Sequence, residues 1–397
     1  MKIGTVTWIT YQNYGTVLQA CALQQAVRQL GYENEILSDR EVLAEHRKLH
    51  PYEKAKPAEP DSAGQGTAAR GLGLLRQPRR LLRTLKARLD PEGYAAPYEE
   101  SQKAIAAFIE QDMSVRRELS PDSLAALNGE YDAFLCGSDQ IWSLRPADFN
   151  PYYFLSFAKK PKLAYAPSLG TERISDERAA ELAGLLRDFF ALSVRESRSA
   201  EQLSALLGRE VTWAADPTLL HDRAFWEDFC RAVPKRGGKY LLCYFLEDRA
   251  WYFRYAEALA KKLRLRLLLL PSRWEHLRRG SVDTGVVGPR EFVARFRDAA
   301  FVLTDSYHGS IFSLLFERDF QYLLRFRSDD PNSQNLRIES LFGLLSLEER
   351  IVTEDRTQPN RPDPMNYPEL REKLAEFRET SLHYLSNGLS AIQEDQP

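Results

Sequence analysis

The sequence predicts a two-domain α/β protein with parallel sheets, and three observations support that prediction. Strand-like and helix-like segments alternate along almost the whole chain, as they do where helices connect parallel strands. The alternation stops at Asp216-Pro217, because proline disfavours helix at the residue before it, and then begins again. With 397 residues, the chain is long enough for two domains that each have their own core.

Residues 1–215 form the first predicted domain. Gly31 follows its first predicted helix, and glycine is the residue that most often ends a helix. The expected strands are 2–9, 34–38, 131–136, 162–166, 191–194 and 211–215, and the expected helices are 16–30, 98–112, 175–188 and 198–207.

Residues 216–367 form the second predicted domain, and 368–397 form a helical tail. Because two α/β halves meet near residue 216, we expect a cleft between them, where ligands commonly bind. The expected strands are 240–246, 265–270, 301–304 and 322–326, and the expected helices are 225–232, 251–263, 290–299 and 310–316, with one or two more over 368–393.

An inserted segment interrupts the first domain at about 46–97. Its stretch 70–89 carries seven basic residues and no acidic one, with leucines at every fourth position (Leu81, Leu85 and Leu89). An amphipathic helix that packs on its own domain would explain this pattern. A helix that contacts anionic lipid or a lipid-linked acceptor would explain it too, and both interpretations stay open.

The composition argues against several classes of protein. A net charge of −2 and a pI near 6.4 do not favour a nucleic-acid partner. The four cysteines lie far apart without a CxxC pair, and no histidine pattern suggests a metal site. The beginning of the chain does not resemble a signal peptide, and no apolar run approaches the roughly 20 residues that span a bilayer. We therefore expect a cytoplasmic protein without a metal or resident cofactor, with any membrane contact at the inner face.

The first of five candidate motifs is Asn13-Tyr14-Gly15-Thr16, between the first strand and the first helix. Glycine lets backbone amides approach a ligand, and a helix N-terminus favours an anion. A purely structural turn explains the motif equally well. It is not a GxGxxG sequence, so it does not support dinucleotide binding.

The second motif, CGSDQIW, follows the expected strand 131–136. Polar side chains at the carboxyl end of a strand face the crevice of such a sheet. Asp139 could cap the next helix, or it could act as a base toward a hydroxyl group of an acceptor. Gln140 and Trp142 come directly after it.

Two further motifs place an arginine near the end of a strand. Arg195, in SVRES, could grip a carboxylate or phosphate through two parallel hydrogen bonds, or it could pair with Glu196. Arg337, in NSQNLRIE, begins an amphipathic helix, where it could equally be a surface residue.

The remaining motif is the strongest, because a strand leads through Asp305 and Ser306 to His308 and then into an apolar helix. Amides at the start of that helix, at Gly309 and Ser310, could bind phosphate, with His308 beside them as a proton donor. A structural role for the histidine is equally open.

Together these motifs resemble the polysaccharide pyruvyl transferase family. They appear in one order over most of residues 1–345, whereas the insertion and the C-terminal helix lie outside the close match. The matching stretches are NYGTVLQACALQ, GSDQIWS, LAYAPSLG, SVRES, DPTLL, DSYHGSIFSLLF and NSQNLRIESLFGLL.

The resemblance implies a glycosyltransferase-B-like fold, in which two Rossmann-like domains face a cleft. It also implies transfer of pyruvate from phosphoenolpyruvate to two hydroxyls of a glycan or lipid-linked sugar, as a ketal, with release of phosphate. The family pattern carries over to Arg195 and His308 at the donor and to Asp139 as the acidic residue. Some members have arginine where this chain has Ser306, so Arg337 or another nearby arginine must supply that charge.

Two alternative functions remain open. They are a nucleotide-sugar glycosyltransferase of the same fold and a non-catalytic protein that binds anionic glycans.

The hypothesis of a pyruvyl transferase divides the site residues into three groups. The expected residues are His308 and Asp139 for catalysis, Arg195, Ser306, Gly309, Ser310 and Arg337 for the donor, and Asn13, Tyr14, Gly15, Gln140 and Trp142 for the acceptor.

Overall fold

The computed structural model describes the chain in several stretches. The basic segment 70–89 lies outside them, so its contact with lipid or acceptor stays a prediction. The described residues are 1–10, 13–49, 91–145, 148–279, 281–327, 330, 333–356, 358–360 and 362–395, without the side chains of 45–49 and 91–95.

The N-terminal half contains one sheet of six parallel strands. Its strands are β1 (Lys2–Val6), β2 (Glu33–Leu37), β3 (Val115–Arg116), β4 (Ala133–Cys136), β5 (Lys162–Ala164) and β6 (Phe189–Ala191). They lie in the order β3-β2-β1-β4-β5-β6, and Val6 pairs with Leu37 on one side and Cys136 on the other. The strand order reverses between β1 and β4, so the loops after these strands open on a crevice.

Helices connect these strands. The first helix is followed by Gly31, whose φ of 91° is costly for residues other than glycine. The helices of this half are α1 (Tyr14–Gln29), α2 (Arg40–Leu49), α5 (Pro91–Asp112), α6 (Asp176–Leu186) and α7 (Ser197–Leu207), with 3-10 turns η1 (Pro121–Gly129), η2 (Gln140–Trp142), η3 (Pro151–Phe154) and η4 (Pro217–Leu219).

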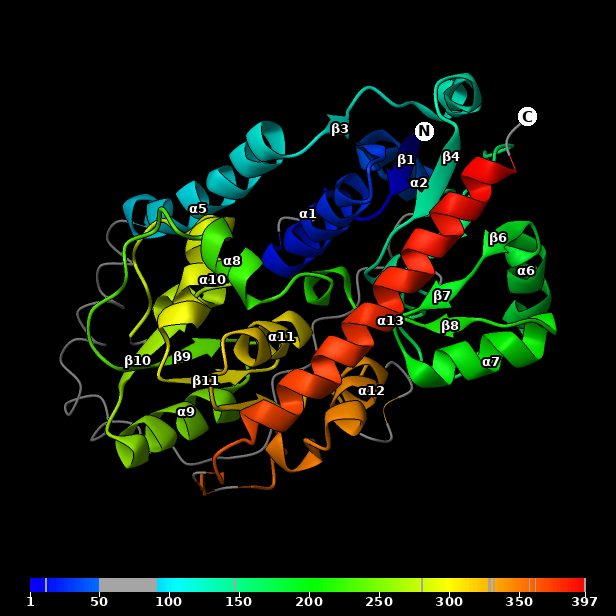
Figure 1. The fold of residues 1–397 in the computed structure, drawn as a ribbon. Helices are drawn as coiled ribbons and strands as arrows, with labels where there is room; N and C mark the ends of the chain where they lie inside the picture. The colour runs from blue at the N-terminus through cyan, green and yellow to red at the C-terminus, as the bar shows by residue number, and fades with distance from the viewer. Residues whose placement is uncertain are drawn as a thin grey trace.

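The C-terminal half contains a second parallel sheet, of five strands. Its elements are α8 (Arg223–Phe229), β9 (Tyr240–Tyr244), α9 (Ala250–Leu263), β10 (Arg266–Leu270), η5 (Trp274–Arg278), α10 (Pro289–Asp298), β11 (Phe301–Thr304), α11 (Tyr307–Leu315), β12 (Phe320–Leu323), α12 (Leu336–Leu345), η6 (Glu348–Arg350), β13 (Ile351–Val352) and α13 (Tyr367–Glu394). Alternate residues of β9 point to opposite faces, so Leu242 packs with the core of α10 and α11, and Leu241 with that of α9. The predicted fold of two parallel α/β halves is confirmed (Figure 1).

The last two expected strands of the first half, 191–194 and 211–215, are found in part. Ala191 belongs to β6 of the main sheet, whereas β7 (Ser193–Val194) and β8 (Thr212–Trp213) pair with each other in a separate two-stranded sheet. The Ser193 hydroxyl donates to Ala164 O (2.9 Å) and accepts from Ala166 N (3.0 Å). A side chain thus connects β7 to the end of β5.

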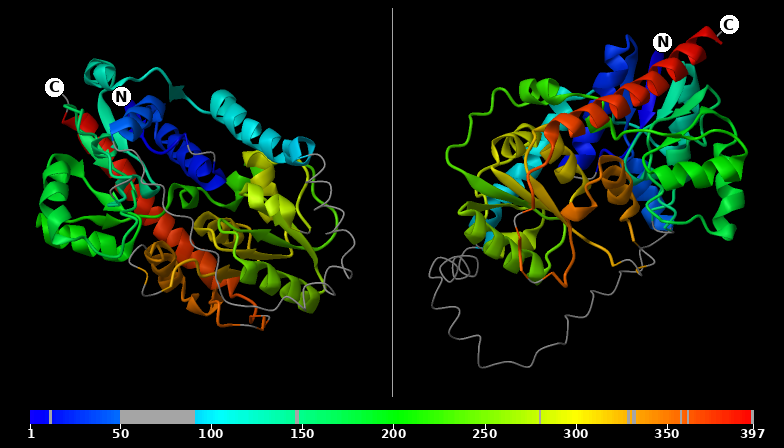
Figure 2. Two further views of the ribbon diagram at one scale, coloured as in Figure 1. Left: turned by 180° about the vertical axis from the view of Figure 1, so that it is seen from behind. Right: turned by 60° about the horizontal axis from the view of Figure 1, so that its bottom comes forward.

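The helical tail is one helix, α13, and it packs on both halves (Figures 1 and 2). Leu370 and Leu374 join the core that contains α10 and α11. Leu385 and Leu389 join the core under β1 and β5, where Gly388 lies so close to Leu163 that a Cβ would be 2.9 Å from its Cδ1. The tail therefore belongs to the structural cores of both halves.

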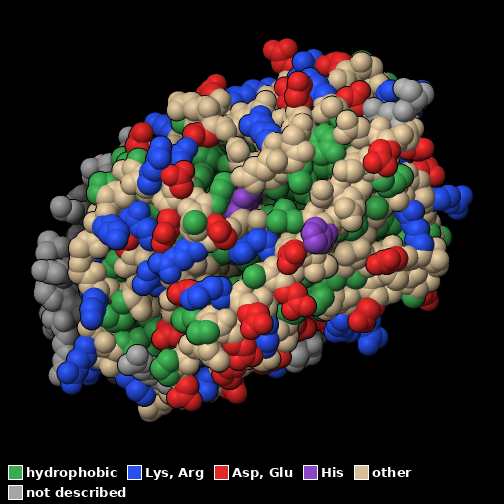
Figure 3. Space-filling model, viewed as in Figure 1, with side chains coloured by type: hydrophobic (Ala, Val, Ile, Leu, Met, Phe, Trp, Pro, Cys, Tyr) green, Lys and Arg blue, Asp and Glu red, His purple; other side chains and the backbone are tan. Residues whose placement is uncertain are grey.

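The two halves also share an apolar core. Tyr14 and Val17 of α1 lie in one cluster with Phe292 of α10 and Phe312 of α11. At the surface, acidic and basic side chains are interspersed over most of the face in Figure 3, in keeping with the small net charge. No helix in the described stretches is long and apolar enough to cross a membrane.

Because α13 is part of the core, shortening one of its buried side chains should destabilise the protein. Leu389 is 1% exposed, so Leu389→Ala should lower the free energy of unfolding by about 2–5 kcal/mol. Urea unfolding followed by tryptophan fluorescence measures this change. The control is Glu379→Ala, an exposed position of the same helix, and equal unfolding midpoints for the two variants would contradict the role of α13.

Candidate active site

A cavity of about 380 Å³ lies where the two halves meet. Three helices, α1, α11 and α12, begin at its wall, and a helix N-terminus favours negative charge. Residues from both halves line it, among them Asn13, Tyr14, Thr16, Asp139, Gln140 and Arg145 from the first half and Ser306, His308, Arg325 and Arg337 from the second.

His308 lines this cavity from the first turn of α11, directly after β11. Its ring packs on Gly15, where an added Cβ would lie 2.2 Å from Nδ1. Gly15 itself is not among the residues that line the cavity, and its predicted acceptor contact stays a prediction. Its function in the structure is to leave room for the imidazole.

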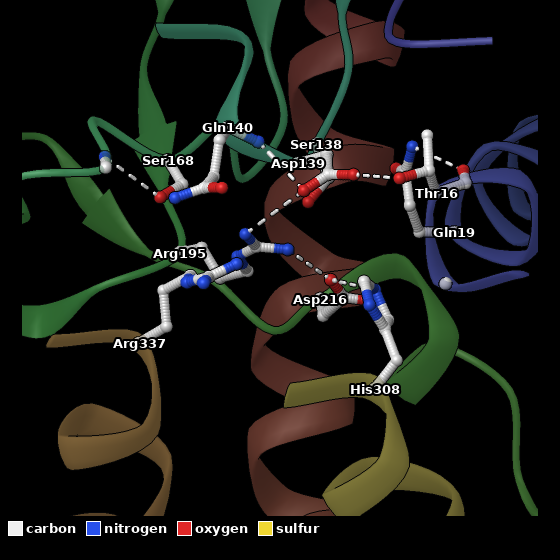
Figure 4. A network of polar contacts seen from close by, with 12 residues as sticks. Thr16, Gln19, Ser138, Asp139, Gln140, Ser168, Arg195, Asp216, His308 and Arg337 are labelled. Atoms are coloured by element: carbon white, nitrogen blue, oxygen red, sulfur yellow. Dashed lines mark hydrogen bonds and ion pairs between the residues drawn. The ribbon is translucent and has the colours of Figure 1, made fainter. Parts of the chain in front are cut away.

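Asp216 holds the other side of the His308 ring (Figure 4). Its Oδ2 lies 3.4 Å from His308 Nε2 and accepts a 2.7 Å hydrogen bond from Arg195 Nη1. Its Oδ1 accepts from the amide (3.0 Å) and the hydroxyl (2.6 Å) of Thr218. Burial alone would raise the pKa of Asp216, but His308 and Arg195 outweigh it and lower that pKa below its ordinary value.

The sequence interpretation used Asp216 only as a domain break. It follows β8, however, and the rule that polar residues at the ends of strands face the crevice would have indicated it. This carboxylate, and not a direct contact, brings Arg195 and His308 together.

Arg195 lies behind the cavity wall, and its side chain is 0% exposed. Besides Asp216, its guanidinium is 3.6 Å from Asp139 Oδ1 and lies over the Tyr307 ring at 4.8 Å. Arg195 is not among the residues that line the cavity, and its predicted contact with a donor carboxylate stays a prediction. Its charge is committed to buried carboxylates, and it connects Asp139 to Asp216.

Asp139 lines the cavity from the other half of the protein, and of the two roles that its sequence motif left open, the capping role is confirmed while the role as a base stays a prediction. It caps η2, because Oδ1 accepts from Gln140 N (2.9 Å), while Oδ2 accepts from Thr16 Oγ1 (2.7 Å). Its backbone has φ 73° and ψ −174°, a region that is almost confined to glycine. Such strain is concentrated at active sites, which supports a functional role for this carboxylate.

Arg337 gives the cavity a positive charge without a carboxylate partner. Its guanidinium donates to Gln334 O (3.4 Å) and Oε1 (3.2 Å), and no ion pair joins it to an acid within the described stretches. Burial, Arg195 and Arg325 lower its pKa to about 10. Arg325 also lines the cavity, paired with Glu247 at 3.2 Å. These two arginines lie where the sequence interpretation required a cation to compensate for Ser306.

The other donor residues have structural contacts. Ser306 lines the cavity and caps α11 by accepting from Gly309 N (3.3 Å). Gly309 and Ser310 are not among the lining residues, and their predicted donor contacts stay predictions. A Cβ at Gly309 would lie 2.4 Å from Thr304 Oγ1, and the fully buried Ser310 hydroxyl donates to Ser306 O (3.4 Å).

Asp305, beside Ser306, is buried and accepts from the amides of Leu246 (2.6 Å) and Glu247 (3.1 Å). Burial raises its pKa to about 6. It fixes the loop after β9, and Leu246 of that loop lines the cavity. The aspartate of the strongest motif therefore shapes the wall of the site.

Among the predicted acceptor residues, Asn13, Tyr14 and Gln140 line the cavity, and their roles stay predictions. Trp142, by contrast, is fully buried and its Nε1 donates to Tyr153 O (3.0 Å), and its predicted contact with the acceptor stays a prediction. Gln140, two residues earlier, points to the cavity instead. The sequence interpretation missed further lining residues, namely Trp8, Gln102, Arg145, Asp148 and Arg273.

No group of three or more metal-binding side chains occurs in the described part of the chain. The cavity brings together an imidazole, a facing carboxylate and cations. Such a set can hold a small polyanion and transfer protons beside it.

Replacing Asp216 should destabilise the protein strongly at neutral pH. Asp216→Asn leaves Arg195 buried without its partner, which costs about 3–5 kcal/mol. Because folding lowers the pKa of Asp216, its contribution is present above the ordinary aspartate value of about 3.9 and is lost as the pH falls toward the folded value.

Urea unfolding at about pH 7 and about pH 3 measures this difference, which should be smaller in acid. Asp228→Asn, in an exposed pair with Arg231, serves as the control and should have little effect. A variant as stable as wild type at neutral pH would contradict the prediction.

Comparisons with known proteins agree with the sequence motifs. No curated protein matches the chain. Similar solved structures include UDP-GlcNAc 2-epimerase from Neisseria meningitidis (12% identity, 96% of this chain and 100% of that chain, TM-score 0.41), the E. coli heptosyltransferase WaaC with ADP (15%, 95% and 100%, 0.38) and Acinetobacter baumannii MurG (9%, 99% and 99%, 0.41). Likeness at this level carries no information about substrate.

A family model gives the decisive comparison. The model described as "Polysaccharide pyruvyl transferase" matches residues 13–320, which is well over half of the chain and includes Asp139, Arg195, Asp216 and His308. The chain therefore belongs to the polysaccharide pyruvyl transferase family.

Proposed function

We propose that this protein transfers pyruvate from phosphoenolpyruvate to two hydroxyls of a glycan or lipid-linked sugar, forming a ketal and releasing phosphate. The observation that carries the proposal is that His308 and Asp139 line one cavity from opposite halves, joined behind its wall by Asp216 and Arg195. A proton donor and a proton acceptor are thus available beside groups that favour an anion.

The donor would lie against the second half of the protein. Phosphoenolpyruvate carries a carboxylate and a phosphate, and Arg337 offers a fork of N–H donors that forms no ion pair with an acid among the described residues. Arg325 and the first turn of α11 add positive potential beside it. Arg195 would act from behind the wall, as a positioning residue.

The proposed reaction begins with protonation of the donor. Nε2 of His308 faces Asp216, so Nδ1 is the ring nitrogen that can donate a proton to the donor. The proton goes to the methylene carbon, which becomes a methyl group. The first acceptor hydroxyl attacks the adjacent carbon while Asp139 takes its proton. Asp216 stays ionised and stabilises the positive charge on the imidazole.

The second half of the reaction closes the ketal. The bond from carbon to the phosphate oxygen breaks, and the phosphate leaves with the proton that Asp139 had taken. The second hydroxyl attacks the same carbon, and its proton restores His308. Two hydroxyl protons therefore leave the acceptor, of which one balances the new methyl group and one goes with phosphate.

His308→Ala should slow phosphate release by about 10²–10⁴-fold, because a positioned acid contributes that much to a proton transfer. The assay measures phosphate from phosphoenolpyruvate across a panel of glycan acceptors, and mass spectrometry of the product detects the added pyruvate. His383→Ala, an exposed histidine on α13, is the control.

Two results would contradict the proposed function. One is near-normal turnover by His308→Ala. The other is a wild-type protein that binds a UDP-sugar and gives no response to phosphoenolpyruvate, which would indicate the nucleotide-sugar alternative.

Gly15→Ala should impair the same reaction by displacing the His308 ring, although Gly15 itself supplies no reacting group. Its methyl would lie 2.2 Å from His308 Nδ1, so the ring has to move, and a misplacement of about 1 Å can cost about 10²-fold in rate. Gly184→Ala in α6, where an added Cβ meets nothing within 4 Å, is the matched control. Equal phosphate-release rates for the two variants would show that the contact with Gly15 does not matter.

A further inference from the structure

We propose that the C-terminal helix α13 positions the active site, through contacts of Ser381 and Arg378 with the backbone on either side of Asp216. Both residues lie beyond position 320, where the family match ends. The kinetic consequence of this role rests on the proposed function, whereas its structural consequence for His308 does not.

The segment that carries Asp216 is fixed to α13 at two backbone atoms. The Ala215 amide donates to Ser381 Oγ (2.9 Å), and Arg378 Nε donates to the Leu219 carbonyl (2.7 Å). The Ala215 carbonyl accepts from Tyr165 of the first half (2.9 Å). Because these hydrogen bonds hold the backbone on both sides of Asp216, they fix the position from which its side chain extends.

The donor and acceptor roles in the hydrogen bond between Ser381 and Ala215 are defined. Ser381 is 0% exposed, and its hydroxyl donates to the carbonyl of Phe377 one turn earlier (2.7 Å), so its oxygen is free to accept from Ala215. The ring of Phe377 also packs on Trp213 at 4.8 Å between centroids. Figure 4 shows the helix passing behind Asp216 and Arg195.

The contact between Asp216 and His308 is sensitive to a small movement of this segment. At 3.4 Å it is already longer than the 2.7 Å bond to Arg195, so a shift of Asp216 would release His308 first. Positioning errors of about 1 Å can cost about 10²-fold in rate even when they arise away from the reacting atoms.

Other polar residues of α13 make contacts of the same kinds at a distance from Asp216, and they supply matched controls. Ser390 lies 3.4 Å from the Tyr32 hydroxyl, near the end of the helix. Arg371 pairs with Glu317, and its side chain is 67% exposed. Ser381 and Arg378, by contrast, hydrogen-bond to the backbone of residues 215 and 219.

The test compares Ser381→Ala with Ser390→Ala in the full chain, by NMR of ¹⁵N-labelled histidine. The signal of His308 is assigned by its loss in His308→Gln. We expect Ser381→Ala to move the His308 imidazole signals and to leave those of His276 unchanged, whereas Ser390→Ala moves neither. With phosphoenolpyruvate and an accepted glycan, kcat should fall about tenfold or more with little change in KM for the donor.

A second pair of variants tests the other contact. Arg378→Leu should move the same signals, and Arg371→Leu should not, so a folding defect of Ser381→Ala alone does not decide the question. His308 signals that coincide with wild type in the folded variants overturn the positioning role. If they move while wild type releases no phosphate from phosphoenolpyruvate, the proposed function fails and the positioning role stands.

Discussion

The structure depends on one buried carboxylate at the junction of its halves. Asp216 is 0% exposed, yet each of its oxygens has partners: Thr218 at Oδ1, and Arg195 with His308 at Oδ2. Replacing a buried ion pair by apolar residues of similar size is often neutral or stabilising. The main effect of such a network is therefore on geometry and not on stability. It determines where the imidazole of His308 lies relative to the first half.

The same network explains the strained backbone at Asp139. A φ of 73° costs about 1–3 kcal/mol for a residue other than glycine, so the surroundings must enforce it. Thr16 from α1 and Arg195 hold the carboxylate from two sides, at 2.7 and 3.6 Å. Helix α1 thus serves both functional side chains, because Thr16 fixes Asp139 and Gly15 admits the ring of His308.

The fold was largely predictable from the sequence, whereas the partners of the site residues were not. Alternation of strands and helices is a local property, so parallel sheets and most element positions followed from it. Chain neighbours such as Gln140 and Trp142 share a motif, but a buried 3-10 turn directs them to different environments. The contacts of Arg195 with Asp216 and of Ser381 with Ala215 join residues 21 and 166 positions apart, and no local pattern indicates such pairs.

Arg195 and Arg337 differ in the charges that surround them. A guanidinium that is fully desolvated needs carboxylates close by, and Arg195 has Asp216 and Asp139, so little of its charge is available to a ligand. Arg337 lies at the cavity wall with the side-chain amide of Gln334 as its partner, and burial, together with Arg195 and Arg325, lowers its pKa. An anion in the cavity would stabilise the charged form of Arg337, whereas a cation or a neutral molecule would not. The charges at this wall therefore favour a small anion.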